Sequence, residues 1–184
     1  MRVLVTGASG FSGSAVVRRL TRDGLDVVGT FRRDTVFLAP LRELPRLTLI
    51  RTDLTDATRL VGPFDSIVHT AATSPAPGIG VAQLVRDNID ATLALIEAAR
   101  RWGTRRFVFF SSLSLHGRIE QEIVDEATPV RDPDPYGASK LIAEQRLAEL
   151  AGELPALALR LPGIVGPGAH RNWLSGVADR IRKG

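Results

Sequence analysis

Cysteine is absent from this chain of 184 residues, and aromatic residues make up only 5% of it. Without cysteine there can be no disulfide, no thiolate metal site and no cysteine nucleophile, which suits a reducing compartment. No apolar run approaches the roughly 18 residues that a membrane span needs, and a glycine turn follows the first strand too early for a signal peptide. We therefore expect a cytoplasmic protein that does not enter a membrane.

Single-stranded nucleic acid is an improbable partner, because few aromatic side chains are available to stack on bases. The formal net charge is +4, but 20 acidic residues are interspersed among 24 basic ones along the whole chain. Scattered charge of this kind is typical of a solvated surface. The three histidines, at positions 69, 116 and 170, are too dispersed to form a metal site. We expect a small-molecule ligand, with no nucleic acid and no metal.

What the chain does contain is a regular alternation of apolar runs. Short β-branched runs predict strands at Arg2 to Thr6, Asp26 to Phe31, Leu47 to Arg51, Ser66 to His69, Arg106 to Ser111 and Ala156 to Leu161. Amphipathic stretches predict helices near Gly10 to Asp23, Ala57 to Leu60, Val81 to Trp102 and Tyr136 to Ala151. This order predicts an α/β fold of the Rossmann type, a doubly wound parallel sheet with helices on both faces.

A glycine-rich turn follows the first predicted strand. Its glycines are Gly7, Gly10 and Gly13, with Ser9 and Phe11 between them, and a helix pattern begins inside the turn. Glycine at these places permits a tight turn, a close approach of the backbone to a pyrophosphate, and close packing of helix on strand. A purely structural turn is the alternative, but the position between strand and helix favours a dinucleotide site.

Two arginines follow the second predicted strand, where a dinucleotide site usually carries an acid for the ribose. Arg32 and Arg33 favour a 2′-phosphate, because guanidinium groups form charge-assisted bonds to phosphate. NADP is therefore favoured over NAD. The alternative is that both arginines face solvent and that Asp34 holds the ribose.

Asp53 and Leu54 follow the third predicted strand, which ends at Arg51. A carboxylate here can accept a hydrogen bond from an adenine amine, or it can simply cap the helix that follows.

The only tyrosine, Tyr136, lies four residues before Lys140, and the only other lysine is Lys183. Positions four apart share a helix face, so the ammonium can lie beside the phenol and favour its ionised form. Such a phenol is a proton donor or acceptor closer to neutral pH. An accidental surface pair is the alternative for these two residues taken alone. The polar segment from Arg118 to Pro135 leads into them and is long enough to be a loop over a site.

Together these motifs resemble the short-chain dehydrogenase/reductase superfamily. The resemblance rests on the glycine turn, Asp53-Leu54, the segment from His69 to Ala72, Asn88, the pair Ser111-Ser112, and Tyr136 with Lys140, all in the expected order. Within the superfamily the chain is similar to the extended branch, the NAD-dependent epimerase/dehydratase family that includes UDP-glucose 4-epimerase.

The resemblance implies a role for each matching residue. Ser112, Tyr136 and Lys140 are implied as catalytic: Tyr136 as acid/base, Ser112 as a donor to the substrate oxygen, and Lys140 as the group that tunes Tyr136 and binds the nicotinamide ribose. Residues implied at the cofactor are Gly7, Ser9, Gly10, Phe11, Gly13, Arg32, Arg33, Asp53, Leu54, Ala71, Ala72, Asn88, Tyr136 and Lys140. Asn88 is expected to bind neighbouring main chain, and His69 to be a packed imidazole rather than a base. His116 stands where the family usually has tyrosine, and either contacts substrate or lines the rim of the pocket.

Two departures from the family pattern limit what the resemblance implies. Gly163 stands where nucleotide-sugar enzymes have an asparagine that helps to hold the substrate diphosphate, so less polar alcohols and ketones compete as substrates. The chain also stops where the family's substrate-binding lobe begins. We expect residues 1–168 to form the NAD(P)-binding domain and residues 169–184, with Trp173, Leu174, Val177 and Ile181 on one apolar face, to start a truncated substrate-binding region. A homodimer is expected, and a cofactor-binding sensor or scaffold without catalysis remains the alternative function.

Overall fold

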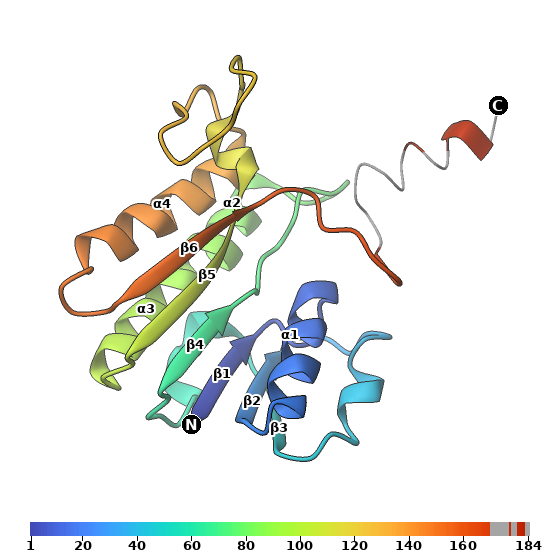
Figure 1. Cartoon of the computed structure of the whole chain (residues 1–184), viewed down its shortest axis with the longest axis vertical. Helices are drawn as coiled ribbons and strands as arrows, with labels where there is room; N and C mark the ends of the chain where they lie inside the picture. Colours follow the sequence, from blue (N-terminus) through green and yellow to red (C-terminus); the bar gives the residue numbers. More distant parts are fainter. Residues whose placement is uncertain (170–176, 178–179, 183–184) are drawn as a thin grey trace.

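A six-stranded parallel sheet forms the centre of the chain in the computed structural model, which describes residues 1–169, 177 and 180–182 (Figure 1). Its strands are β1 (Arg2–Thr6), β2 (Asp26–Phe31), β3 (Leu47–Arg51), β4 (Ser66–His69), β5 (Arg106–Ser112) and β6 (Ala156–Leu161). They lie in the order β3-β2-β1-β4-β5-β6, and every neighbouring pair is parallel. The predicted Rossmann-type sheet is confirmed.

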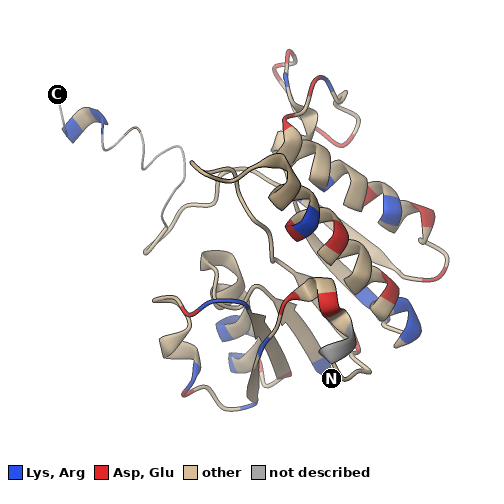
Figure 2. Cartoon of the chain, turned by 180° about the vertical axis from the view of Figure 1, so that it is seen from behind, with Lys and Arg blue, Asp and Glu red and all other residues tan. Residues whose placement is uncertain are grey.

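Helices cover both faces of the sheet. The longer ones are α1 (Phe11–Arg22), α3 (Ala91–Arg101) and α4 (Pro135–Glu149). A single helical turn, α2 (Val81–Leu84), comes before α3 in the chain. The other helical turns are the 3-10 turns η1 (Ala39–Leu41), η2 (Leu54–Arg59) and η4 (Leu113–His116) and the π-helical turn η3 (Val85–Asp90). Figures 1 and 2 show α1 on one face and α3 with α4 on the other. Two predicted helices differ: the stretch near 57–60 is a 3-10 turn, and the stretch 81–102 is interrupted by the π-helical turn η3.

Two apolar clusters hold the layers together, one on each face. Successive residues of a strand point to opposite faces, so Val3 and Val5 of β1 pack with α1 while Leu4 between them packs on the other side. The second cluster includes Phe107 and Phe109 of β5, which are almost completely buried. On the outer side of α3 and α4, basic and acidic residues alternate (Figure 2) and form ion pairs across the two helices, such as that of Arg146 with Glu97.

Strand β6 is the exception to this burial. It lies at the edge of the sheet, and Leu157 in it is 57% exposed. Val108 of β5, its neighbour in the register, is only half-buried. Of the expected apolar face after β6, Trp173 and Leu174 lie outside the described residues, and the described Ile181 is exposed.

Candidate functional site

The strand order places a crevice between β1 and β4. From β1 the chain moves outward through β2 to β3, and then it returns to β4 and moves the other way. Ligands of doubly wound sheets bind at this reversal, beyond the carboxyl ends of the strands. We therefore expect the candidate site among the loops that follow β1, β2, β3 and β4.

The glycine turn after β1 has the close packing that the sequence predicted. Gly7 has a left-handed φ of 74°. A Cβ on Gly13 would lie 2.1 Å from the Gly7 carbonyl oxygen and 2.7 Å from Thr70 Oγ1, so only glycine lets α1 approach the turn. Helix α1 starts after Gly10 with no side-chain cap and no acidic residue in its first turn. Its N-terminal N–H groups and positive dipole end suit an anion.

A cavity of about 870 Å³ extends from this turn along the ends of β2, β3 and β4. Ten of the residues predicted at the cofactor line it: Gly7, Ser9, Gly10, Phe11, Arg32, Arg33, Asp53, Leu54, Ala71 and Ala72. Gly13, Asn88, Ser112, Tyr136 and Lys140 are not among the lining residues. The cavity thus joins the three loops assigned from sequence to a pyrophosphate, a ribose and an adenine.

Arg32 forms an ion pair that the sequence did not reveal. Both of its terminal nitrogens donate to Asp87, from Nη1 to Oδ1 at 2.8 Å and from Nη2 to Oδ2 at 2.9 Å. The bond from Arg32 is the main reason that the pKa of Asp87 is lowered to about 2. Arg33 is exposed and lines the same cavity. Asp34, the alternative ribose ligand, is exposed and pairs with Arg42 instead.

Asp53 acts as a cap, which was one of its two predicted roles. Its Oδ1 accepts a bond from the backbone N–H of Thr55 at the start of η2. Its Oδ2 pairs with Arg86 at 2.6 Å. Asp53 also lines the cavity, so capping and ligand contact are compatible in position.

The π-helical turn η3 presents Asp87 and its neighbour Asn88 to the same loop. Thr73, four residues after β4, donates from Oγ1 to Asp87 and from its backbone N–H to Asn88 Oδ1, both at 2.7 Å. Asn88 Nδ2 donates to the Thr73 carbonyl and to Ser139 on α4. Buried Asn88 therefore ties neighbouring main chain, as expected for it, and links the cavity wall to α4.

The three predicted catalytic residues lie at the end of β5 and the start of α4. Ser112 ends β5, and its Oγ bonds the N–H and the hydroxyl of Ser114. Helix α4 begins after Asp134, whose side chain accepts a bond from the Gly137 N–H at 2.7 Å. A Cβ on Gly137 would lie 2.2 Å from the Ser114 carbonyl oxygen, so the start of α4 rests directly on the turn that follows Ser112.

The electrostatics of Tyr136 differ from the prediction. Burial, and after it the charge of Asp134, raise the pKa of Tyr136, so the expected lowering by Lys140 is wrong for the chain in this structure. The reason is the placement of Lys140: its ammonium donates to the carbonyl of Phe110 at 2.9 Å and lies 5.6 Å from the Tyr136 ring centroid. Burial lowers the pKa of Lys140 to about 8.

The two described histidines are buried. His69 bonds Thr6 Oγ1 at 2.6 Å and Thr92 Oγ1 at 2.8 Å, and burial lowers its pKa to about 3, so it is a packed neutral imidazole as expected. His116 is completely buried and is not among the residues that line the cavity.

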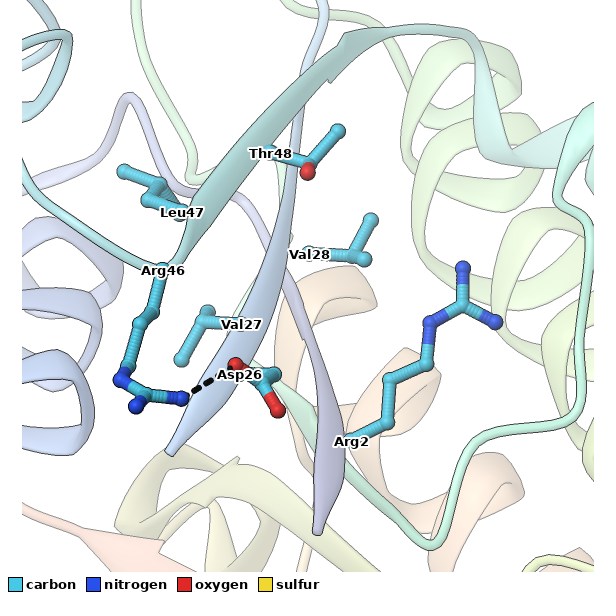
Figure 3. Close-up of a pocket in the computed structure, with 7 residues that line it drawn as sticks. All are labelled: Arg2, Asp26, Val27, Val28, Arg46, Leu47 and Thr48. Carbon is cyan, nitrogen blue, oxygen red and sulfur yellow. Dashed lines mark hydrogen bonds and ion pairs between the residues drawn. The ribbon is translucent and has the colours of Figure 1, made fainter. Parts of the chain in front are cut away.

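A second cavity, of about 430 Å³, lies at the amino ends of β1, β2 and β3, opposite the carboxyl ends that border the first cavity (Figure 3). Its charged groups already have partners. Arg46 pairs with Asp26 at 3.1 Å, and Arg2 donates to the carbonyls of Val61 and Pro63. No functional role is assigned to this cavity.

Comparison with known proteins gives the family. Residues 3–184 match the model of the NAD dependent epimerase/dehydratase family. The chain belongs to this family. Among its relatives, the chain is 33% identical over 181 residues to a UDP-glucose 4-epimerase of Streptomyces lividans, covering 92% of this chain and 54% of that protein. It is 36% identical over 173 residues to a dTDP-glucose 4,6-dehydratase of Streptomyces niveus, covering 86% and 49%.

Two solved structures have a similar fold. A UDP-galactose 4-epimerase is 28% identical, with a TM-score of 0.84 over 100% of this chain and 63% of its own. The Bordetella bronchiseptica enzyme WbmH in complex with NAD+ is 27% identical, with a TM-score of 0.87 over 100% and 62%. The chain spans about half the length of the sequence relatives named above. Among the described residues, no helix is both long and apolar enough to cross a membrane.

Proposed function

We propose that this chain is the dinucleotide-binding part of an NAD(P)-dependent epimerase, dehydratase or oxidoreductase. The observation that carries the proposal is the cavity of about 870 Å³, which starts at the glycine turn and runs along the ends of β2, β3 and β4. The pyrophosphate would lie against the start of α1, where backbone N–H groups and the helix dipole face it. The bound cofactor supplies the hydride chemistry.

Ser112, Tyr136 and Lys140 are proposed as the catalytic group. Because burial raises the pKa of Tyr136, its phenol is neutral and able to donate a proton at neutral pH. Ser112 at the end of β5 would donate to the same substrate oxygen and hold it in place. Lys140 would bind the nicotinamide ribose and, by turning its charge toward the phenol, lower the cost of ionising it.

The adenosine end of the cofactor is proposed to lie between the ends of β2 and β3. Structural neighbours include enzymes bound to NAD. The preference for NADP over NAD stays a prediction, and it rests on Arg32 and Arg33. Because Asp87 already holds Arg32, Arg33 is the guanidinium with room for a 2′-phosphate.

The substrate is proposed to be a sugar, and a nucleotide sugar is the first candidate because relatives are named for UDP-glucose and dTDP-glucose. Gly163 lacks the side chain that would help to hold a diphosphate, so alcohols and ketones without one belong in the same assay. Residues 169–184 are proposed to begin a substrate-binding region. The homodimer stays a prediction.

The test is turnover of NAD(H) and NADP(H) with a panel of nucleotide sugars, sugars and ketones in the intact protein. Tyr136→Phe removes only the hydroxyl, so we expect turnover to fall by about 100-fold or more, in the range that one acid–base group contributes. Binding of the dinucleotide should stay within about threefold. Tight binding without turnover, unchanged in Tyr136→Phe, would instead support the sensor or scaffold.

A further inference from the structure

Asp87 is an acid in the wall of the proposed cofactor cavity to which the proposed function gives no role. Its side chain is 4% exposed, whereas that of Arg32 is 39% exposed. Four residues donate to its carboxylate or pair with it: Arg32 through both terminal nitrogens, Thr73 through its hydroxyl at 2.7 Å, Gln83 through its side chain, and Arg86 at 3.6 Å. A buried carboxylate with so many fixed partners is held in one place.

The backbone explains how this acid reaches the cavity. Asp87 lies in the π-helical turn η3, between α2 and α3. A π turn inserts an extra residue into a helix and is often found at functional sites. Here Asp87 and its neighbour Asn88 both bond Thr73, in the loop after β4.

The geometry of the pair determines what Arg32 can still do. An arginine recognises phosphate best when two parallel N–H groups face two oxygens. In Arg32 the fork made by the two terminal nitrogens faces Asp87, so the carboxylate fixes the direction of the guanidinium and neutralises its charge. The Nε side keeps its own N–H groups, but the paired guanidinium attracts a phosphate less than a free one does. Arg33, the next residue, is exposed, lines the same cavity and forms no ion pair with the described residues.

We infer that Asp87 is a specificity-determining residue that withholds Arg32 from the 2′ position of the adenosine ribose and leaves 2′-phosphate recognition to Arg33. This inference rests on the proposed dinucleotide site. It has a consequence for the choice of cofactor: Asp87 lowers the preference for NADP that two free arginines would give, and it keeps NAD usable. Removing its charge should release the fork of Arg32 toward the phosphate.

The experiment is titration calorimetry of NADH and NADPH against the intact protein and its variants. The measured quantity is the ratio of the two dissociation constants, because effects on the shared parts of the cofactor cancel in it. Asp87→Asn preserves volume and should shift the ratio toward NADPH by about tenfold, a moderate value for one charge near a partly exposed site. Asp90→Asn makes the same charge change at an exposed position of the same turn, and should leave the ratio within twofold.

Two further variants keep the inference falsifiable if Asp87→Asn folds poorly. Arg33→Ala, at an exposed position, should shift the ratio toward NADH by about tenfold, whereas Arg32→Ala should change it by less than threefold. In the Arg32→Ala background, Asp87→Asn should no longer matter, because the residue it releases is gone.

The inference is overturned if Asp87→Asn leaves the ratio unchanged, if its effect persists without Arg32, or if Arg32→Ala costs NADPH more than Arg33→Ala does. These outcomes leave the proposed function intact as long as the unaltered protein binds either dinucleotide. If it binds neither, the proposed function fails, and the inference fails with it.

Discussion

Replacing Lys140 by methionine should make this protein more stable while it removes activity. Lys140 is 4% exposed, and burial lowers its pKa from 10.5 to about 8. At pH 7 the folded chain therefore holds a charged ammonium in a place that disfavours the charge. Methionine has a similar length without the charge, and it fills irregular spaces well.

The size of this stabilisation follows from the lowered pKa of Lys140. Burial lowers the pKa of Lys140 from 10.5 to about 8, so at pH 7 the buried charge costs roughly 3 kcal/mol. Against this, the Phe110 carbonyl loses the donor that Lys140 provides at 2.9 Å, which costs roughly 1–2 kcal/mol. The net gain is about 1–2 kcal/mol. For a chain of this length, that raises the melting temperature by about 2–8 °C.

The pH dependence gives a second signature. The unfolded chain binds a proton at this lysine up to its ordinary pKa, while the folded chain releases it near pH 8, so stability rises with pH between about 8 and 10.5. Few other side chains titrate between pH 8 and 10.5, because the chain has no cysteine, one tyrosine and one other lysine. Urea unfolding from pH 7 to pH 9.5 measures the slope, which Lys140→Met should abolish and Lys183→Met should keep. A Lys140→Met variant that is less stable than the parent at pH 7, with the slope unchanged, would show that the buried charge of Lys140 does not destabilise the folded chain.

Two more predictions concern the glycine turn and the buried histidine. Gly13→Ala places a methyl group 2.1 Å from the Gly7 carbonyl oxygen, so α1 must move; we expect a loss of about 2–3 kcal/mol in thermal unfolding and weaker dinucleotide binding. Burial lowers the pKa of His69 to about 3, so stability should fall as pH drops below 6.5, by up to about 1.4 kcal/mol per unit between pH 6 and 5. His69→Gln should flatten that slope in urea unfolding.

Each of these has a matched control. Gly152→Ala adds the same methyl group where nothing lies within 4 Å, and it should leave stability and binding nearly unchanged. His170→Gln should keep the acid slope. Equal losses in the two glycine variants would show that the close approach at Gly13 does not matter, and an acid slope retained in His69→Gln would mean that another group causes it.

Local sequence patterns predicted the sheet well, because each strand is a short apolar run bounded by turn residues. Five of the six predicted strands have the observed bounds, and β5 extends one residue further, to Ser112. The close packing of the glycine turn was equally predictable, since it depends on the absence of side chains within a few residues.

The sequence could not reveal contacts between distant segments. Arg32 and Asp87 are 55 positions apart, and their pairing depends on a π turn that no local periodicity signals. The same limit explains the error at Tyr136. The spacing correctly placed Tyr136 and Lys140 on one helix, but the ammonium bonds Phe110 of β5, which only the packing of α4 on the sheet decides. The exposure of β6 likewise could not be predicted, because its apolar run has the same local pattern as the buried strands.

The central claim is that the cavity beyond β1 to β4 binds a nicotinamide dinucleotide. Calorimetric titration of NADH and NADPH into the intact protein tests it most directly, with Gly13→Ala and Gly152→Ala beside the parent. We expect saturable binding of one dinucleotide per chain, kept in Gly152→Ala and weakened at least tenfold in Gly13→Ala. Absence of binding to the folded parent, or binding that Gly13→Ala does not change, would contradict it.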